Sequence, residues 1–307
     1  MREDAVPFGT GTDGILDVAG HVASTGITVG PEVTQVARLA APDIAALPPA
    51  RLRQAIEIVI LSPFAPQALQ WLYDAGVLAV LLPELEATVD FSQEAGRRHK
   101  DVWEHTKQVV MQAPARPLVR WAALLHDIGK VSTRLLLPDG RVTFHRHAEV
   151  GARMFGTIAR RFGFERSERQ RIYALILHHL RANAYEAEWT DAAVRRFDHE
   201  MGDVLDDLIE LSRADVTSAR PGRKQEAARN IEALMQRIQA VRALDARTPP
   251  LPPGVGNAIM EAFQVPPSRR VGELRKLCED AITRGDLAER QPAEYYVDFL
   301  RRQGITG

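Results

Sequence analysis

The apolar residues of this chain recur at three- and four-residue spacing along most of its length. The segments VTQVARLAA, ARLRQAIEIVI and APQALQWLYDAG each carry one apolar stripe at the period of an α-helix. Proline near the start of such segments and a glycine such as Gly76 at the end are typical helix boundaries. A chain with this pattern buries its apolar surface by packing helices together, so we expect an all-α fold.

The same period continues through the middle and the end of the chain. It predicts helices in DVWEHTKQVVMQ, PLVRWAALLHDIGK, HAEVGARMFGTIARRF, SERQRIYALILHHL and DVLDDLIELSRADV, and later in QEAARNIEALMQRIQAVRAL, VGELRKLCEDAITRG and PAEYYVDFLRR. One segment differs. In LLLPDGRVTF the turn signal Pro138-Asp139-Gly140 separates two short apolar runs, which predicts a small β-hairpin.

Composition divides the chain into four regions. Residues 1–30 are rich in Gly, Thr and Asp without a clear period, so we expect an extended arm. Residues 31–95 form a helical region that ends in a polar stretch, and residues 96–220 contain the hairpin and the central helices. Residues 221–307 form a helical tail region beyond that.

The overall composition argues against several classes of protein. With 307 residues and 45% apolar content the chain can bury a core, and 39 basic against 40 acidic residues favour neither a nucleic-acid nor a membrane surface. A polyanion would therefore have to meet a local patch. The single cysteine, Cys278, and a start without a secretory signal point to the cytoplasm. No apolar run approaches the roughly 18 residues that span a bilayer.

Histidines cluster in the middle of the chain. Of nine histidines, six lie between residues 105 and 179, several beside acidic residues or each other. A divalent metal needs imidazole or carboxylate donors that converge from different segments. His105, His126, Asp127 and Asp215 stand on three separate predicted helices, and a helical bundle can turn all four toward one ion.

The adjacent pair His126-Asp127 closes the apolar run WAALL, and a polar pair at a buried helix end requires a partner. An isolated pair of this kind is more often a hydrogen bond that caps a helix. Here the pair occurs in LLHDIGK together with the other spaced histidines, so we interpret it as part of a metal site.

Further histidines could hold a second ion. His147 follows the predicted hairpin, and His178 and His179 end the segment YALILHHL. Consecutive helical residues diverge by roughly 100°, so the sequence leaves open which of the two ligates. Two ions can activate a water near neutral pH and hold phosphoryl oxygens, with Asp127 as the natural bridging carboxylate. Such a site accepts Mn, Fe, Co, Ni, Zn or Mg.

Cationic side chains near these positions could hold a substrate phosphate. Lys130 follows the His-Asp pair and Arg181 follows the double histidine, and Arg153 is a third candidate, although ordinary surface charge is the alternative for each. We assign catalytic roles to Asp127, Lys130 and Arg181. His145 is interpreted as a solvated residue at a helix start.

Five of these segments, DVWEHTKQVV, LLHDIGK, FHRHAEVGA, ILHHLRA and LSRADV, appear in the order of the signature segments of the HD superfamily, which this chain resembles. The resemblance implies an HD-domain bundle in which His105, His126, Asp127 and Asp215 are metal ligands. It also implies that His147 and the pair His178 and His179 match the added histidines of two-metal members. The HHE and GYP motifs of the cyclic-di-GMP phosphodiesterases are not found in the sequence.

A second resemblance covers residues from about 31 to 305. PPARLRQAIEIVILSPFAPQALQWLYDAGVLAVLLPEL is similar to the neck, and AIMEAFQVPPSRRVGELRKLCEDAITRGDL to the tail, of bacterial CCA-adding tRNA nucleotidyltransferases and poly(A) polymerases. The polymerase head of that family carries a Gly-Ser pair and paired aspartates, which residues 1–30 lack. We therefore do not expect nucleotide addition.

Together these features predict a metal-dependent phosphohydrolase that uses one or two divalent ions. Family behaviour implies phosphomonoesters or 2′,3′-cyclic phosphates of nucleotides or RNA ends as substrates, with tRNA or RNA ends as partners. The alternative is a non-catalytic module that binds tRNA or a polymerase partner and keeps its metal site for structure.

Overall fold

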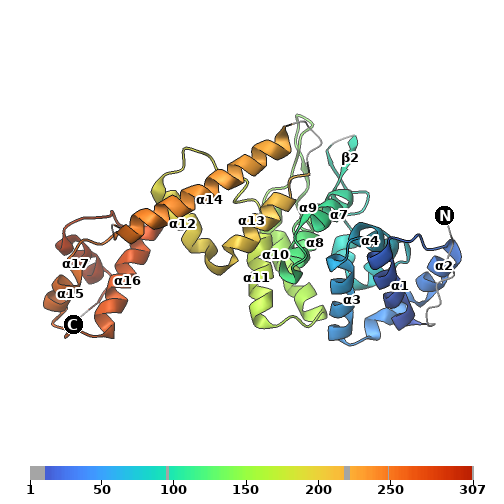
Figure 1. Cartoon of the computed structure of the whole chain (residues 1–307), viewed down its shortest axis with the longest axis horizontal. Coiled ribbons are helices and arrows are strands. Elements are labelled where there is room, and N and C mark those ends of the chain that lie inside the picture. Colours follow the sequence, from blue (N-terminus) through green and yellow to red (C-terminus); the bar gives the residue numbers. More distant parts are fainter. Residues whose placement is uncertain (1–10, 95–96, 218–221, 248, 306–307) are drawn as a thin grey trace. The chain divides into compact units, whose positions relative to one another are not determined.

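The computed structural model describes residues 11–94, 97–217, 222–247 and 249–305 (Figure 1). The predicted helical fold with a small hairpin is confirmed. The chain forms two compact units, one of residues up to Ala184 with Asp206–Ile231, the other of Tyr185–Leu205 with Glu232 onward. The composition places boundaries near residues 30, 95 and 220, whereas the two units meet at residues 184/185, 205/206 and 231/232. The helices before and after residue 95 belong to one unit and share one core.

The first unit begins with a group of short helices, most of which have proline in their first turn. These helices are α1 (Thr12–Thr25), α2 (Pro31–Ala40), the 3-10 helix η1 (Ala41–Ala46), α3 (Pro49–Leu61), α4 (Ala65–Asp74), α5 (Val77–Leu81) and α6 (Pro83–Glu86).

Helix α1 corrects the expectation of an extended arm over residues 1–30. Ile15, Val18, Ala19 and Val22 are buried at helical spacing, and α1 packs against α3 and α4. The surrounding Gly, Thr and Asp hide this stripe in the composition. Residues 1–10 lie outside the described part of the chain.

The central elements of the first unit follow the predicted order. They are β1 (Ser92–Glu94), β2 (Arg97–Asp101), α7 (Val102–Gln112), α8 (Pro117–Leu125), α9 (Lys130–Thr133), β3 (Leu135–Leu136), β4 (Val142–Thr143), α10 (His147–Arg161), α11 (Arg166–His178) and α13 (Leu205–Ala214). The pair β3–β4 is the predicted hairpin, and β1 and β2 form a second antiparallel pair in the stretch that the sequence marks only as polar.

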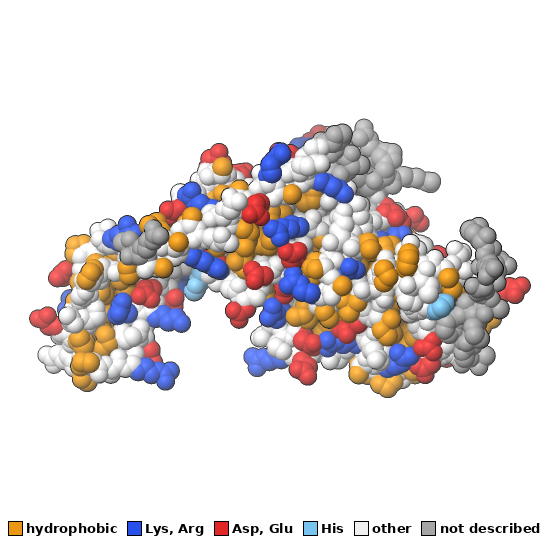
Figure 2. Space-filling view, viewed as in Figure 1, with side chains coloured by type: hydrophobic (Ala, Val, Ile, Leu, Met, Phe, Trp, Pro, Cys, Tyr) orange, Lys and Arg blue, Asp and Glu red, His pale blue; other side chains and the backbone are white. Residues whose placement is uncertain are grey.

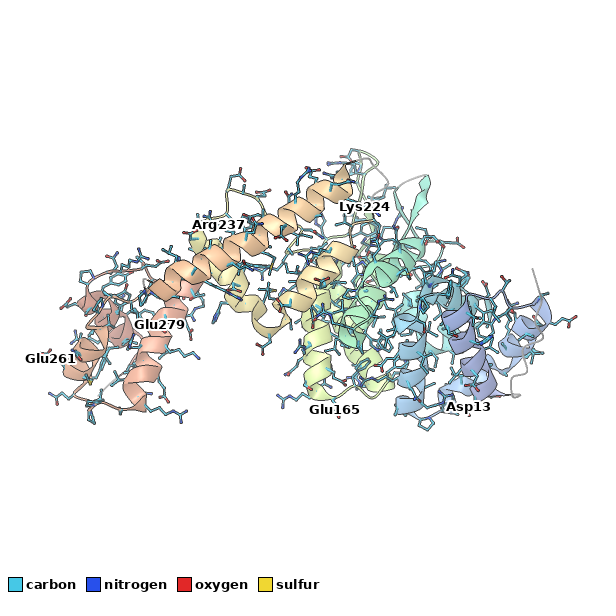
Figure 3. The ribbon with its side chains drawn as sticks, viewed as in Figure 1. Asp13, Glu165, Lys224, Arg237, Glu261 and Glu279 are labelled. Atoms are coloured by element: carbon cyan, nitrogen blue, oxygen red, sulfur yellow. The ribbon has the colours of Figure 1, made fainter. Side chains whose placement is uncertain are left out.

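Local signals explain where several of these helices begin. The Asp101 carboxylate caps α7 by accepting from the Glu104 backbone N–H, as expected for an aspartate at this position. Glu165, labelled in Figure 3, starts α11 with a capping box in which Glu168 is the partner. Glu168 also pairs with Arg53 of α3, at 2.6 Å, which ties α11 to the N-terminal helices.

The shared core of this unit is centred on α8. Trp121 is fully buried against Phe162 and Phe164, and its indole N–H donates to Glu57 of α3 at 3.1 Å. The buried Arg120 guanidinium donates to the Ile60 carbonyl oxygen at 2.7 Å, and burial lowers the pKa of this group. Helix α8 is therefore held from the N-terminal side as well as by α7 and α11.

The second unit is built around its own core. It contains α12 (Asp191–Met201), the 3-10 helix η2 (Gly202–Val204), α15 (Val255–Phe263), α16 (Arg269–Arg284), α17 (Ala293–Arg302) and most of α14 (Arg223–Arg247), which includes the labelled Arg237 of Figure 3. Tyr296 and Cys278 are buried in this core, and Arg195 of α12 pairs with Asp245 and Glu289.

The surface view is consistent with the balanced charge of the sequence. On the face drawn in Figure 2, Lys and Arg side chains alternate with Asp and Glu rather than forming one large field. Among the residues that the structure describes, no helix has the length and apolar character needed to cross a membrane.

A close backbone contact fixes the turn that follows α8. A Cβ atom added at Gly129 would lie 2.1 Å from the His147 carbonyl oxygen and 2.7 Å from the Gly151 backbone nitrogen. These atoms belong to the start of α10, and backbone cannot move aside as a flexible side chain can. Only glycine therefore allows the turn after α8 to touch α10.

We predict that Gly129→Ala destabilises the protein by about 1–3 kcal/mol, the usual range for overpacking a tight interior. Gly156→Ala is the matched control, because a Cβ at this position of α10 meets no atom within 4 Å. The control should be neutral or slightly stabilising, since alanine favours a helix over glycine. Urea unfolding of both variants measures the difference, and equal midpoints would contradict the prediction.

Candidate metal centre

The site begins at the carboxyl end of α8, where all residues from Val119 to Leu125 are buried. Since this helix is covered on every side, the residues that end it lie inside the protein. His126 is the C-cap of α8 and Asp127 follows, and they are 1% and 2% exposed. A buried imidazole beside a buried carboxylate needs partners from other elements.

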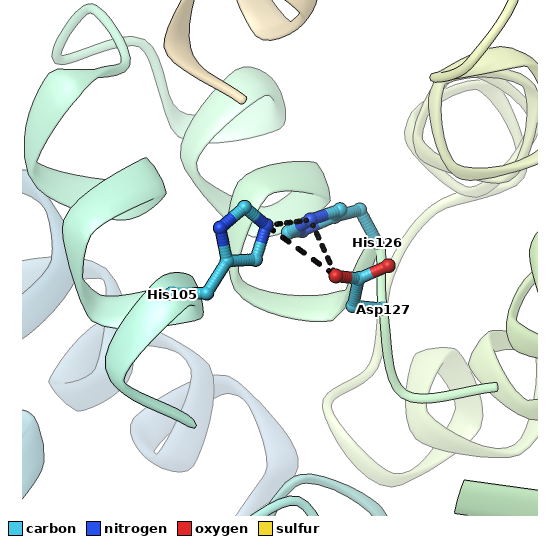
Figure 4. A group of neighbouring side chains, drawn as sticks. All are labelled: His105, His126 and Asp127. Carbon is cyan, nitrogen blue, oxygen red and sulfur yellow. Dashed lines mark hydrogen bonds and ion pairs between the residues drawn. The ribbon is translucent and has the colours of Figure 1, made fainter. Parts of the chain in front are cut away.

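A first group of donors forms between α7 and the end of α8. His105 lies on α7, and in Figure 4 its ring faces His126 and Asp127. Its Nε2 is 3.1 Å from His126 Nε2 and 3.4 Å from Asp127 Oδ2. Asp215, directly after α13, joins them with Oδ1 at 3.0 Å from His105 Nε2. The structure thus brings the four predicted ligands of the first ion together.

A second group lies on the other side of the same carboxylate. His147 is the first residue of α10 and His179 is the C-cap of α11. Their Nε2 atoms are 3.3 Å apart, and they lie 3.4 and 3.9 Å from Asp127 Oδ1. His147, His179 and Asp127 are all buried.

Asp127 therefore belongs to both groups, and each group faces a different oxygen. Oδ2 faces His105 and His126, whereas Oδ1 faces His147 and His179. A carboxylate with one oxygen toward each of two donor sets is the arrangement that a bridging ligand of two ions requires.

The ring nitrogens away from the centre are also engaged. His126 Nδ1 lies 2.8 Å from the Ala123 carbonyl oxygen, His147 Nδ1 2.9 Å from that of Phe144, and His179 Nδ1 2.7 Å from that of Ile176. A carbonyl oxygen only accepts, so Nδ1 carries the proton. The pKa values of His147 and His179 are lowered, so each of these Nε2 atoms is left with its lone pair toward the centre, as in metal-binding histidines.

Charge within this buried cluster shifts the pKa of its members. Burial lowers the pKa of His126, but the charges and hydrogen bonds of Asp127 and Asp215 outweigh it and raise the pKa to about 10. Burial and then the charge on His126 lower the pKa of His179 to about 4. Although burial opposes ionisation of Asp127, His126 and Lys130 hold its pKa well below the usual value. His126 and Lys130 thus carry the positive charge that compensates the carboxylates.

The other predicted residues lie at different distances from this centre. Lys130 Nζ is 2.7 Å from Asp127 Oδ2 and 5.6 Å from the centre of the Phe144 ring. His178, the last residue of α11, is half-buried and belongs to neither donor group among the described residues, so the structure brings only His179 of this pair into the site. Arg181 follows in the turn after α11, where its backbone N–H donates to the His178 carbonyl oxygen at 2.9 Å. Arg153 and His145 are exposed.

Sequence reasoning missed Thr217. Its Oγ1 lies 2.8 Å from His105 Nδ1, across 112 residues of chain. In the sequence, Thr217 is only a threonine two residues after Asp215, and nothing in its local pattern indicates a contact with a distant imidazole.

Comparisons with known proteins agree with this architecture. The family described as HD domain matches residues 91–220, so this part of the chain is an HD domain. The family described as "Probable RNA and SrmB-binding site of polymerase A" matches residues 26–88.

The A-adding tRNA nucleotidyltransferase of Deinococcus radiodurans is 33% identical over 91% of this chain and 66% of its own length. The CC-adding enzyme of Thermus thermophilus is 31% identical over 82% of this chain and 56% of its own length. The chain is thus a homologue of the tRNA nucleotidyltransferases and spans no more than about two thirds of these relatives. The crystal structure of the Bacillus stearothermophilus CCA-adding enzyme in complex with CTP, at 18% identity, has the same fold over 95% of this chain and 62% of that one, with a TM-score of 0.52.

The raised pKa of His126 leads to a prediction about metal binding. Without metal, His126 is protonated at neutral pH, and a metal ligand must be deprotonated, so binding of a first Mn²⁺ should release about one proton. The affinity should rise roughly tenfold for each pH unit above neutrality until His126 loses its proton without metal. Calorimetric titrations in Hepes and in Tris measure the released proton as a difference in binding enthalpy. Equal enthalpies in the two buffers would rule out proton release.

Proposed function

We propose that this chain is a metal-dependent phosphohydrolase with two divalent ions in the centre described above. The first ion would be held by His105, His126, Asp127 and Asp215, and the second by Asp127, His147 and His179. The single observation that carries this proposal is that the two oxygens of the buried Asp127 carboxylate face two separate donor sets.

The donors fit such ions by type. Imidazole nitrogens and carboxylate oxygens suit Mn, Fe, Co, Ni and Zn, and the carboxylates tolerate Mg. His147 and His179 already have their Nε2 lone pairs free of a proton, because Nδ1 donates to a backbone carbonyl oxygen, and His126 gains this lone pair when it loses its proton. When bound, divalent ions would supply a nucleophile near neutral pH and draw negative charge from a phosphoryl group.

Residues of the chain itself would bind and orient the substrate. The Lys130 ammonium group lies beside Asp127 at the edge of the centre, where it is placed to hold a phosphoryl oxygen. We assign the same role to Arg181, which lies two residues beyond His179. His178 is not needed as a ligand in this proposal.

Two comparisons support the proposed substrate class. The match of residues 26–88 to an RNA-binding family and the homology to enzymes that act on tRNA support a substrate that contains nucleotides. We propose phosphomonoesters or 2′,3′-cyclic phosphates at nucleotides or RNA ends.

A module that binds RNA without turnover is the second candidate, and the same match of residues 26–88 favours it. In that case the metal centre would stabilise the HD domain without chemistry. The full set of donors, together with a cation beside them, supports the enzyme over this alternative, because a structural ion needs neither a second donor set nor Lys130.

We predict that Asp127→Asn abolishes hydrolysis of nitrophenyl phosphate and of nucleoside 2′,3′-cyclic phosphate by the Mn²⁺-loaded protein. The loss should exceed the roughly 10- to 100-fold cost of removing an outer partner of a metal ligand, because Asp127 serves both groups. Asp139→Asn in the exposed hairpin turn is the matched control and should retain full activity.

The same assay separates the two candidates. If the wild-type protein binds tRNA and Mn²⁺ but turns over none of these esters, the RNA-binding module is favoured. If Asp127→Asn retains wild-type turnover, the activity does not arise from this centre.

We predict that His179→Ala removes one ion and keeps the other. This substitution takes a donor from the second group alone, since His179 faces His147 and the Oδ1 atom of Asp127, whereas the first group faces Oδ2. Elemental analysis after dialysis should show one fewer ion per chain than in the wild type. Exposed His199→Ala is the control, and an unchanged metal content in His179→Ala would contradict a second site.

A further inference from the structure

Three of the four imidazoles in the centre are oriented by their own turn of chain. His126, His147 and His179 each place Nδ1 on the carbonyl oxygen of the residue three positions earlier. These histidines lie at helix ends, where such carbonyl oxygens either lie outside the helix or lack a partner within it.

His105 has no such local acceptor. It lies inside α7, where the carbonyl oxygens of preceding residues accept from the helix's own N–H groups. Its Nδ1 instead meets the Thr217 hydroxyl at 2.8 Å, just beyond the end of α13. The orientation of this ring therefore depends on a tertiary contact.

We infer that Thr217 is a positioning residue that sets the affinity of the first ion alone. An imidazole that binds through Nε2 must carry its proton on Nδ1 and needs an acceptor there. The Thr217 hydroxyl is that acceptor. Without it, the His105 ring is free to rotate and its proton can occupy Nε2, which turns the lone pair away from the centre.

The same short segment also positions Asp215. Gln112, the last residue of α7, donates from its side-chain amide to the Ala214 carbonyl oxygen at 2.6 Å. The segment after α13 is thus attached to α7 at two points, near His105 through Thr217 and at the helix end through Gln112. Two of the four donors of the first group depend on these contacts.

The second group has no comparable dependence. The rings of His147 and His179 are held by carbonyl oxygens of their own turns, and the hydroxyl of Thr217 contacts His105. Loss of this hydroxyl should therefore weaken the binding of the first ion and leave the binding of the second unchanged. A substitution that merely loosened the fold would weaken both.

The test is a titration of the 307-residue chain and of its Thr217→Val and Thr217→Ser variants with Mn²⁺, in which binding is measured by calorimetry and by electron paramagnetic resonance. Valine keeps the shape of threonine and removes its hydroxyl, whereas serine keeps the hydroxyl. The first ion is measured in the His179→Ala background and the second in the His105→Ala background. Thr157→Val on the exposed surface of α10 is the matched control.

We expect Thr217→Val to lower the affinity for the first ion roughly 10- to 100-fold, as loss of an outer partner of a metal ligand usually does. Thr217→Ser should restore wild-type binding, and the second ion should bind equally in all variants. Wild-type affinity in Thr217→Val, or an equal loss at both ions, would overturn the inference. The inference rests on the proposed metal centre but not on the reaction. If the wild-type protein itself binds no Mn²⁺, the centre fails, and if it binds Mn²⁺ without turnover, only the hydrolase fails.

Discussion

The buried carboxylate of Asp127 is the constraint on which the rest of the first unit depends. It lies at the end of a helix that is covered on all sides, and it is ionised because His126 and Lys130 hold its pKa low. A buried charge is costly unless it is paired and hydrogen-bonded. Histidines of α7, α10 and α11 therefore reach this one residue, and Asp215 after α13 pairs with His105 and His126.

The packing around α8 makes this convergence possible. Trp121 and Arg120 fix α8 to the N-terminal helices, so the region that matches an RNA-binding family and the HD domain share one core. At the other end, Gly129 lets the turn after α8 touch the start of α10, which carries His147. Helix α8 and the tight turn after it thus connect the first donor group to the second.

The four imidazoles of the centre are oriented in two different ways. Three imidazoles are fixed by carbonyl oxygens of their own turns, and the fourth, His105, is fixed by Thr217 from the far end of the domain. The geometry of the second donor group is therefore local, whereas that of the first depends on how α13 ends. In the proposed two-ion centre, this asymmetry would let the affinity of the first ion change without that of the second, even though both would share Asp127.

The sequence by itself determined the helical fold, the β3–β4 hairpin and the donor types, because helical period and turn chemistry are local. It also indicated His105, His126, Asp127 and Asp215, since each stands in a segment with its own pattern. Only the tertiary structure decided that His179 rather than His178 enters the centre, because the rotation at a helix end is set by packing. The tertiary structure also revealed the contact of Thr217 with His105, because these residues are 112 positions apart in the chain. It revealed α1 as well, because the apolar positions of this helix are hidden in a polar composition.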